Sequence, residues 1–125
     1  MSLPTTKNWS VIYSDHSGNV YRFWKTKTDP VAQFSYDPVQ PETSSSGTYS
    51  GGSPRQGNLE AEAITELFLR VRELEAATAS HGQERRMGSG LFRIQEGGEA
   101  PRRFIIAAGA RRKDFDEFVE PYRSS

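Results

Sequence analysis

Arginine is the residue type whose number and spacing in this chain could do binding chemistry. Residues 81–113 carry eight basic side chains against three acidic ones. The basic ones are Arg85, Arg86, Arg93, Arg102, Arg103, Arg111, Arg112 and Lys113. A guanidinium group can hold a carboxylate or a phosphate through two parallel hydrogen bonds. A candidate site for an anion or a nucleic acid is therefore formed by Arg85, Arg86, Arg93, Arg102 and Arg103.

An acidic helix offers a simpler explanation of these charges. Residues 58–79 hold five glutamates against two arginines. If this segment lies beside the basic stretch, the two neutralise each other. Most charge runs are solvated faces that contribute little energy.

The segment 37–57 is the second candidate for binding. Fourteen of its 21 residues are Ser, Thr, Gly or Pro. A segment with so little apolar area cannot offset its ordering entropy, so we expect a flexible loop. It contains Tyr49 and Arg55 in a polar frame, a composition typical of binding loops. The alternative is a tolerated surface insertion, since long loops are either functional or disordered.

Metal and catalytic chemistry have weaker support. The two histidines, His16 and His81, show no metal-ligand spacing. Three turn aspartates could hold a hard cation if the fold gathered them, but the required spacing is absent. They are Asp15, Asp29 and Asp37.

Residues 47–52 form a glycine-rich stretch before a helix, which invites comparison with a phosphate-binding loop. The stretch lacks the lysine that such a loop requires, and no serine lies in a nucleophile elbow. The sequence therefore favours binding over catalysis, and we expect neither a cofactor nor a metal.

Apolar periodicity predicts the elements that position these residues. Alternation indicates strands over residues 8–14, 20–26, 31–36, 91–95 and 102–108. Residues 58–79 are expected to form a helix capped by Asn58, with an apolar stripe of Ile64, Leu67, Phe68, Val71 and Leu74. A short final helix capped by Asp114 should end near Pro121. The predicted fold class is α+β, with an antiparallel sheet of about five strands, a three-stranded meander plus a hairpin. One long helix and a short C-terminal helix should cover it.

Strand register decides which side chains face the core. A five-residue loop places Tyr13 opposite Tyr21 and Val11 opposite Phe23, leaving Ile12 and Trp24 on the other face.

In the later hairpin, a loop of three or five residues puts the apolar set Phe92, Ile94, Phe104 and Ile106 on the core face. Arg93, Gln95 and Arg103 then point outward with Leu91 and Ile105. Arg93 and Arg103 become neighbours of like charge, which is unfavourable. Relief must come from Glu96, Glu99, the acidic helix or a bound anion. The register predicts an outward basic patch at Arg93 and Arg103, extended by Arg85.

Composition sets the outer limits of the prediction. The 125 residues suit a single domain, residues 1–125, that contains the 37–57 loop. The absence of cysteine excludes disulfides and thiolate chemistry and fits a cytoplasmic protein. No apolar run approaches the length of about 18 residues that spans a membrane. A net charge of zero argues against general binding of nucleic acid or membranes.

The sequence thus predicts a small domain that binds another protein through the 37–57 loop. The alternative is anion- or nucleic-acid-associated binding through the arginine-rich hairpin. The candidate binding residues are Tyr49, Arg55, Arg85, Arg93 and Arg103.

Overall fold

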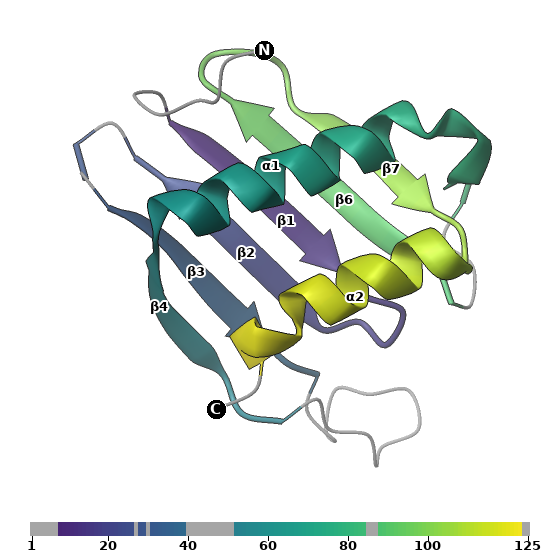
Figure 1. The fold of residues 1–125 in the computed structure, drawn as a ribbon, viewed down its shortest axis with the longest axis horizontal. Helices are drawn as coiled ribbons and strands as arrows, with labels where there is room; N and C mark the ends of the chain where they lie inside the picture. The colour runs from purple at the N-terminus through teal and green to yellow at the C-terminus, as the bar shows by residue number, and fades with distance from the viewer. Residues whose placement is uncertain (1–7, 27, 30, 40–51, 85–87, 124–125) are drawn as a thin grey trace.

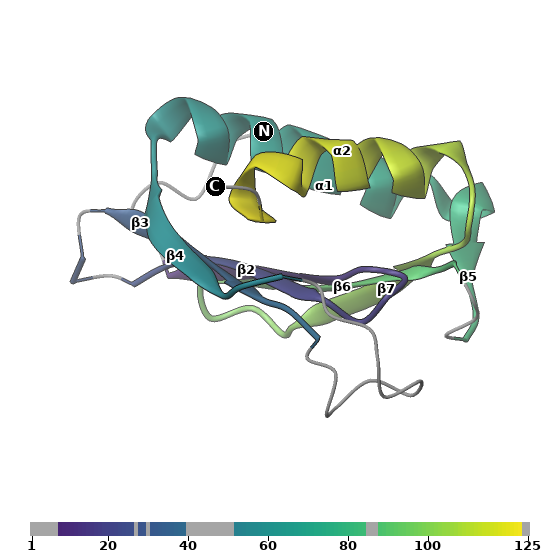
Figure 2. The ribbon, with the colours of Figure 1, turned by 90° about the horizontal axis from the view of Figure 1, so that it is seen from below.

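The fold is an antiparallel sheet with two helices on one face (Figures 1 and 2). This computed structural model describes residues 8–26, 28–29, 31–39, 52–84 and 88–123. The strands within those ranges are β1 (Trp9–Ser14), β2 (Val20–Lys25), β3 (Ala32–Asp37), β4 (Arg55–Leu59), β5 (His81–Gly82), β6 (Gly90–Glu96) and β7 (Arg102–Ile106). They lie in the order β4-β3-β2-β1-β6-β7-β5, so β1 joins the meander to the β6–β7 hairpin.

The described sheet has seven strands, where the sequence predicted about five. The two that were missed, β4 and β5, are edge strands with almost no apolar alternation. β4 has one buried apolar side chain, Leu59, and is held by its pairing with β3. β5 has two residues and pairs only with β7. Edge strands of this kind are specified by backbone hydrogen bonds to a neighbour, which a local pattern does not reveal.

The acidic helix is α1 (Ala61–Ala76), which has 16 residues. The predicted start at Asn58 is wrong, because Asn58 pairs with Gln33 in the sheet and Leu59 enters the core as part of β4. Glu60 becomes the N-cap without a side-chain hydrogen bond. Four of the five residues of the predicted apolar stripe are buried, namely Leu67, Phe68, Val71 and Leu74, and the fifth, Ile64, is partly buried against the core. A 3-10 turn, η1 (Thr78–Ser80), follows the helix.

The C-terminal helix, α2 (Ala110–Arg123), has 14 residues and is longer than predicted. Asp114 is not its cap, since the helix begins four residues earlier, after Gly109. Gly109 has a φ of 154°, which residues with side chains rarely adopt, and its carbonyl accepts from the Lys113 N–H. Pro121 lies inside the helix near its end. None of the helices in the described ranges is both long and apolar enough to cross a membrane.

An aromatic core fills the space between the sheet and the two helices. Both predicted registers are confirmed: Tyr13 is the partner of Tyr21, and Phe92 is the partner of Phe104. The centre of the Tyr13 ring lies 4.7 Å from the centre of the Phe92 ring and 4.9 Å from the centre of the Phe115 ring on α2. Alternating strand residues on one face thus meet the apolar stripes of α1 and α2.

Gly90 on β6 leaves room for the buried ring of Tyr13. A Cβ at Gly90 would lie 2.7 Å from Tyr13 Cε1, which is closer than carbon atoms pack. We expect Gly90→Ala to destabilise the protein by about 1–3 kcal/mol through overpacking. Gly98→Ala, where nothing lies within 4 Å, is the control and should be nearly neutral. Urea unfolding of both variants checks this, and equal stabilities would contradict it.

Candidate functional site

The face of the sheet opposite the helices carries three arginines in one row. Val11 and Tyr13 on β1 are buried in the core between the sheet and the helices, so Ile12 between them faces the other way. Ile12 is the partner of Arg22 on β2 and of Arg93 on β6, and Arg93 is the partner of Arg103 on β7. We call this side of the sheet the open face, because both helices lie on the other side (Figure 2). We call Arg22, Arg93 and Arg103 the arginine row.

The arginine row is only partly neutralised. Arg22 Nε lies 3.2 Å from Asp37 Oδ2, and both side chains are exposed. Arg93 and Arg103 are exposed, and within the described ranges neither has an ion pair or a hydrogen bond. Their predicted outward placement side by side is therefore observed, and no described carboxylate relieves their repulsion.

Polar and apolar side chains flank the arginine row on the open face. On one side, Trp24 pairs with Ser10 and Gln33, and Ser10 pairs with Gln95. On the other side, Leu91 pairs with Ser14 and Ile105. Ile12, Trp24 and Leu91 are half-buried, while Ile105 is only 7% exposed. Ile105 was expected to point outward with Leu91, and it does lie on this face. Ile105 is the partner of Gly82 on β5, the strand at this edge of the described sheet.

Arg55, a predicted binding residue, has a structural role. Its Nη1 donates to the Pro121 carbonyl oxygen at 2.8 Å, and its guanidinium lies 6.0 Å from the centre of the Phe34 ring. Arg55 therefore ties β4 to the end of α2 and does not stand in a loop as expected. Tyr49, Arg85 and Arg86 lie outside the described residues, as does most of the glycine-rich stretch.

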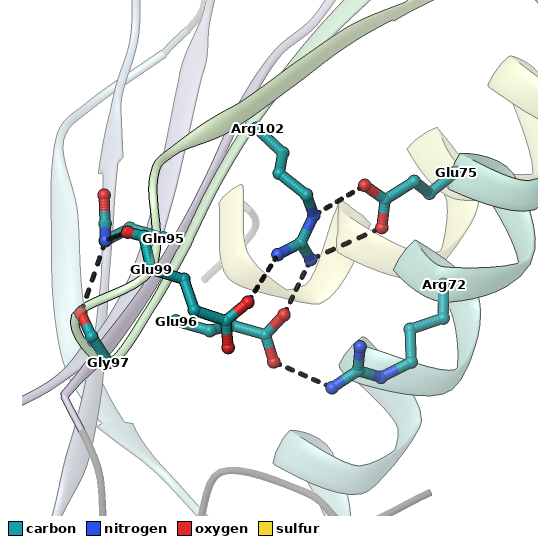
Figure 3. A network of polar contacts seen from close by, with 7 residues as sticks. All are labelled: Arg72, Glu75, Gln95, Glu96, Gly97, Glu99 and Arg102. Carbon is teal, nitrogen blue, oxygen red and sulfur yellow. Dashed lines mark hydrogen bonds and ion pairs between the residues drawn. The ribbon is translucent and has the colours of Figure 1, made fainter.

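Arg102 belongs to the predicted basic site, but carboxylates between β6, β7 and α1 already bind its guanidinium group (Figure 3). It pairs with Ile94 on the core-facing side of the sheet, where it donates to Glu75 at 2.7 Å and to Glu96 at 2.6 Å. Glu96 also accepts from Arg72 at 2.8 Å. The acidic helix thus neutralises Arg102, as the simpler explanation of the charges predicted, but it does not reach Arg93 or Arg103.

The pKa values in this network follow from its geometry. Burial alone would raise the pKa of the Glu96 carboxyl, but hydrogen bonds from Arg102 and Arg72 outweigh it and hold the pKa below its ordinary value. Hydrogen bonds to Glu75 and Glu96 raise the pKa of Arg102. Both shifts favour the charged forms, so the network is an ionic clamp between α1 and the hairpin.

A second polar cluster lies under α2, and the sequence did not predict it. The Tyr13 hydroxyl donates to Asp116, and Arg112 donates to Asp116 and to His16 Nδ1. Burial raises the pKa of Asp116, although the Tyr13 hydrogen bond and the Arg112 charge oppose it. Tyr13 and Asp116 are 103 positions apart, so no local pattern could have joined them. The cluster fastens α2 to β1.

The histidines and turn aspartates have identifiable structural partners. His81 Nε2 lies 2.9 Å from the Leu74 carbonyl oxygen near the end of α1, whereas His16 contacts Arg112 on α2. Asp15 accepts from the Asn19 N–H at 3.0 Å, and Asp29 accepts from the Val31 N–H at 3.0 Å. Within the described part of the chain, no three His, Cys, Asp or Glu residues are grouped as metal ligands would be.

No family model matches this chain, and neither a curated protein nor a solved structure matches it. Function therefore has to be inferred from the residues of the chain itself. Two hollows among the described residues are candidates for a small-molecule site. The cleft between α1 and α2, lined by Leu74, Arg111 and Phe115 among others, holds about 80 Å³, well below the several hundred Å³ typical of such sites. A larger hollow of about 350 Å³ lies between η1 and the start of α2, but its lining of Ala, Gly, Ser80 and Arg111 lacks the aromatic side chains and converging polar groups that such sites use. The open face is the strongest candidate that remains.

Proposed function

We propose that this protein is a binding module that recognises another protein through the open face of its sheet. The observation that carries the proposal is the combination of Ile12, Trp24 and the arginine row on a face that neither helix covers. Tryptophan and arginine are enriched at protein–protein interfaces, where they supply contact area and directed hydrogen bonds. Half-buried apolar side chains between the arginines would be desolvated by a partner.

The 37–57 segment enters this proposal through its position. It begins at Asp37, whose carboxylate holds Arg22 of the arginine row. It returns to the sheet in β4, where Gln56 pairs with Ser35 on the open face. We propose that the segment borders the binding surface and contributes to it, with Tyr49 as its aromatic contact. Arg55 is left out of this role, because it already binds the end of α2.

The alternative function is binding of a phosphate or nucleic acid through the arginine-rich hairpin. Arg93 and Arg103 support it, since both are exposed and lack a described carboxylate. Arg102 does not, because Glu75 and Glu96 occupy its guanidinium. A net charge of zero and a pI of about 6.7 also favour the protein partner, since nucleic-acid-binding domains are usually basic.

Cross-linking from defined positions tests the proposed binding face. The chain has no cysteine, so one introduced thiol can carry a photoactivatable cross-linker. We expect the cross-linker at Ser10→Cys on the open face to capture a specific protein from extracts of the cells in which this protein naturally occurs. The control is Leu69→Cys on α1, where the native side chain is 58% exposed on the helical side.

The captured protein must then bind the unlabelled chain after purification. A bulky label at Ser35→Cys, which also lies on the open face, should block that binding, whereas the label at Leu69→Cys should not. Equal capture from both sides of the molecule, or binding that neither label disturbs, would overturn the proposal.

A further inference from the structure

We infer that the open face takes an acidic, extended segment of its partner, gripped by Arg93 and Arg103. This inference rests on the proposed function and adds the chemistry of the ligand. The arginine row recognises the partner segment by binding its carboxylates.

The charge pairing of the arginines singles out two of them. Carboxylates within 4.0 Å are found for Arg22, Arg70, Arg72, Arg102, Arg111, Arg112 and Arg123. Arg93 and Arg103 are directly opposite each other on β6 and β7, yet the side chain of neither forms an ion pair or a hydrogen bond with a described residue. Opposed like charges destabilise a sheet. A carboxylate supplied from outside removes this penalty, so the free energy of relief contributes to binding.

The spacing of the two arginines suits an extended peptide. Neighbouring strands are about 4.8 Å apart, and alternate side chains on one side of an extended chain are about 6.7 Å apart. Two long guanidinium side chains on adjacent strands can therefore reach two acidic residues at positions i and i+2. Each guanidinium offers a fork of donors that matches a carboxylate.

The open face already shows the same chemistry within the chain. Asp37 at the end of β3 binds Arg22 through its Oδ2 at 3.2 Å, with both side chains about half exposed. This ion pair removes Arg22 from the free part of the arginine row. Asp37→Asn should release Arg22 and extend the free charge across β2, β1, β6 and β7. The prediction is a gain of affinity for acidic ligands from a substitution that lies outside the core.

A peptide segment fits the surroundings better than a nucleic-acid strand. Single-stranded nucleic acid is bound by aromatic side chains that stack on bases, combined with a long basic groove. Trp24 is the single tryptophan on the described open face, and it is half-buried between its strand partners Ser10 and Gln33. Serine and amide side chains next to the arginines can instead hydrogen-bond a peptide backbone.

The probe is a short synthetic peptide in which glutamate alternates with threonine, and its control has glutamine in place of glutamate. Binding to the full chain is followed by the NMR signals of the arginine Nε–H groups at low salt. We expect the signals of Arg93 and Arg103 to shift with the acidic peptide and to stay in place with the control.

Variants of matched charge locate the site. Arg93→Gln combined with Arg103→Gln should weaken binding of the acidic peptide about three- to tenfold, as expected for two exposed charge pairs. Arg111→Gln combined with Lys113→Gln removes the same charge from the exposed surface of α2 and should have little effect. Asp37→Asn should tighten binding about two- to fivefold, since it frees one more exposed charge.

Three results would overturn the inference. They are the absence of binding at low salt, an equal loss with the α2 variant, and tighter binding of an oligothymidylate of the same charge. If the acidic peptide fails while the Ser10→Cys cross-linker still captures a partner, the open face remains the binding surface and only its acidic ligand is refuted. If the cross-linker also fails, the proposed function fails with it.

Discussion

Leu67→Ala should lower the free energy of unfolding by about 2–5 kcal/mol, the range for truncation of a buried leucine. Leu67 is 1% exposed and lies on the face of α1 that packs against the sheet. The substitution leaves a cavity beside the aromatic core, and the surrounding rings cannot collapse fully into it. Urea unfolding measures the change, seen as a lower midpoint at an unchanged slope.

The matched control is two positions further along the same helix. Leu69 is 58% exposed, so Leu69→Ala loses little burial and keeps helix propensity. We expect its stability to stay within about 0.5 kcal/mol of the parent, as for most surface changes. If Leu67→Ala and Leu69→Ala lower the free energy of unfolding by the same amount, α1 does not pack against the sheet through the face described.

Glu96→Gln should destabilise the protein by about 1.5–3 kcal/mol, because hydrogen bonds to charged groups are worth about this much. Glu96 is 8% exposed and accepts from both Arg72 and Arg102 (Figure 3). Without its charge, two partly buried guanidinium groups lose their shared counter-ion. Glu99→Gln is the control: Glu99 lies 3.9 Å from the same Arg102, but its side chain is 64% exposed. We expect a cost below about 1 kcal/mol there.

The effect of Glu96→Gln should depend on pH in a defined direction. The pKa of Glu96 is lowered in the folded state, so its contribution is complete above the ordinary carboxyl pKa of about 4.3. That contribution is lost as the pH falls through the lowered folded-state pKa. The stability gap between parent and variant should therefore be widest near neutral pH and narrow below about pH 4. A gap that stays constant from neutral to acidic pH would show that the charge of Glu96 does not matter.

Much of the sheet could be predicted because its signals are local. Alternation of apolar residues marked the strands around Val11 and Phe104, and parity alone identified the registers of both hairpins. The 3.6-residue periodicity marked the buried face of α1. The residues that form each pattern lie within a few positions of one another, so the pattern can be recognised in the sequence directly.

The errors fall where tertiary contacts overruled local preference. Asn58 is a good helix cap by type, yet it lies in β4 because Leu59 is drawn into the core. Asp114 is also a good cap, but α2 starts earlier, where Gly109 allows the chain to turn. In both places the apolar burial and the backbone turn outweigh a single capping hydrogen bond, which is worth about 1 kcal/mol.

The candidate site divides in the same way. The outward placement of Arg93 and Arg103 was predicted from parity, because a strand alternates its side chains between two faces. The position of Arg22 in the same row could not be predicted. It depends on β1 lying between β2 and β6, and β1 and β6 are distant in the sequence.

By itself the sequence determined the core-facing side of the two hairpins and of α1, and the outward placement of Arg93 and Arg103, since both follow from periodicity along one strand or helix. Only the tertiary structure decided which charges are already satisfied. Arg102 and Arg103 are adjacent in the chain, but one meets Glu75 and Glu96 under α1 while the other faces outward beside Arg93. Ion pairing depends on distances across the fold, because Coulomb energy falls with separation in space and takes no account of separation along the chain.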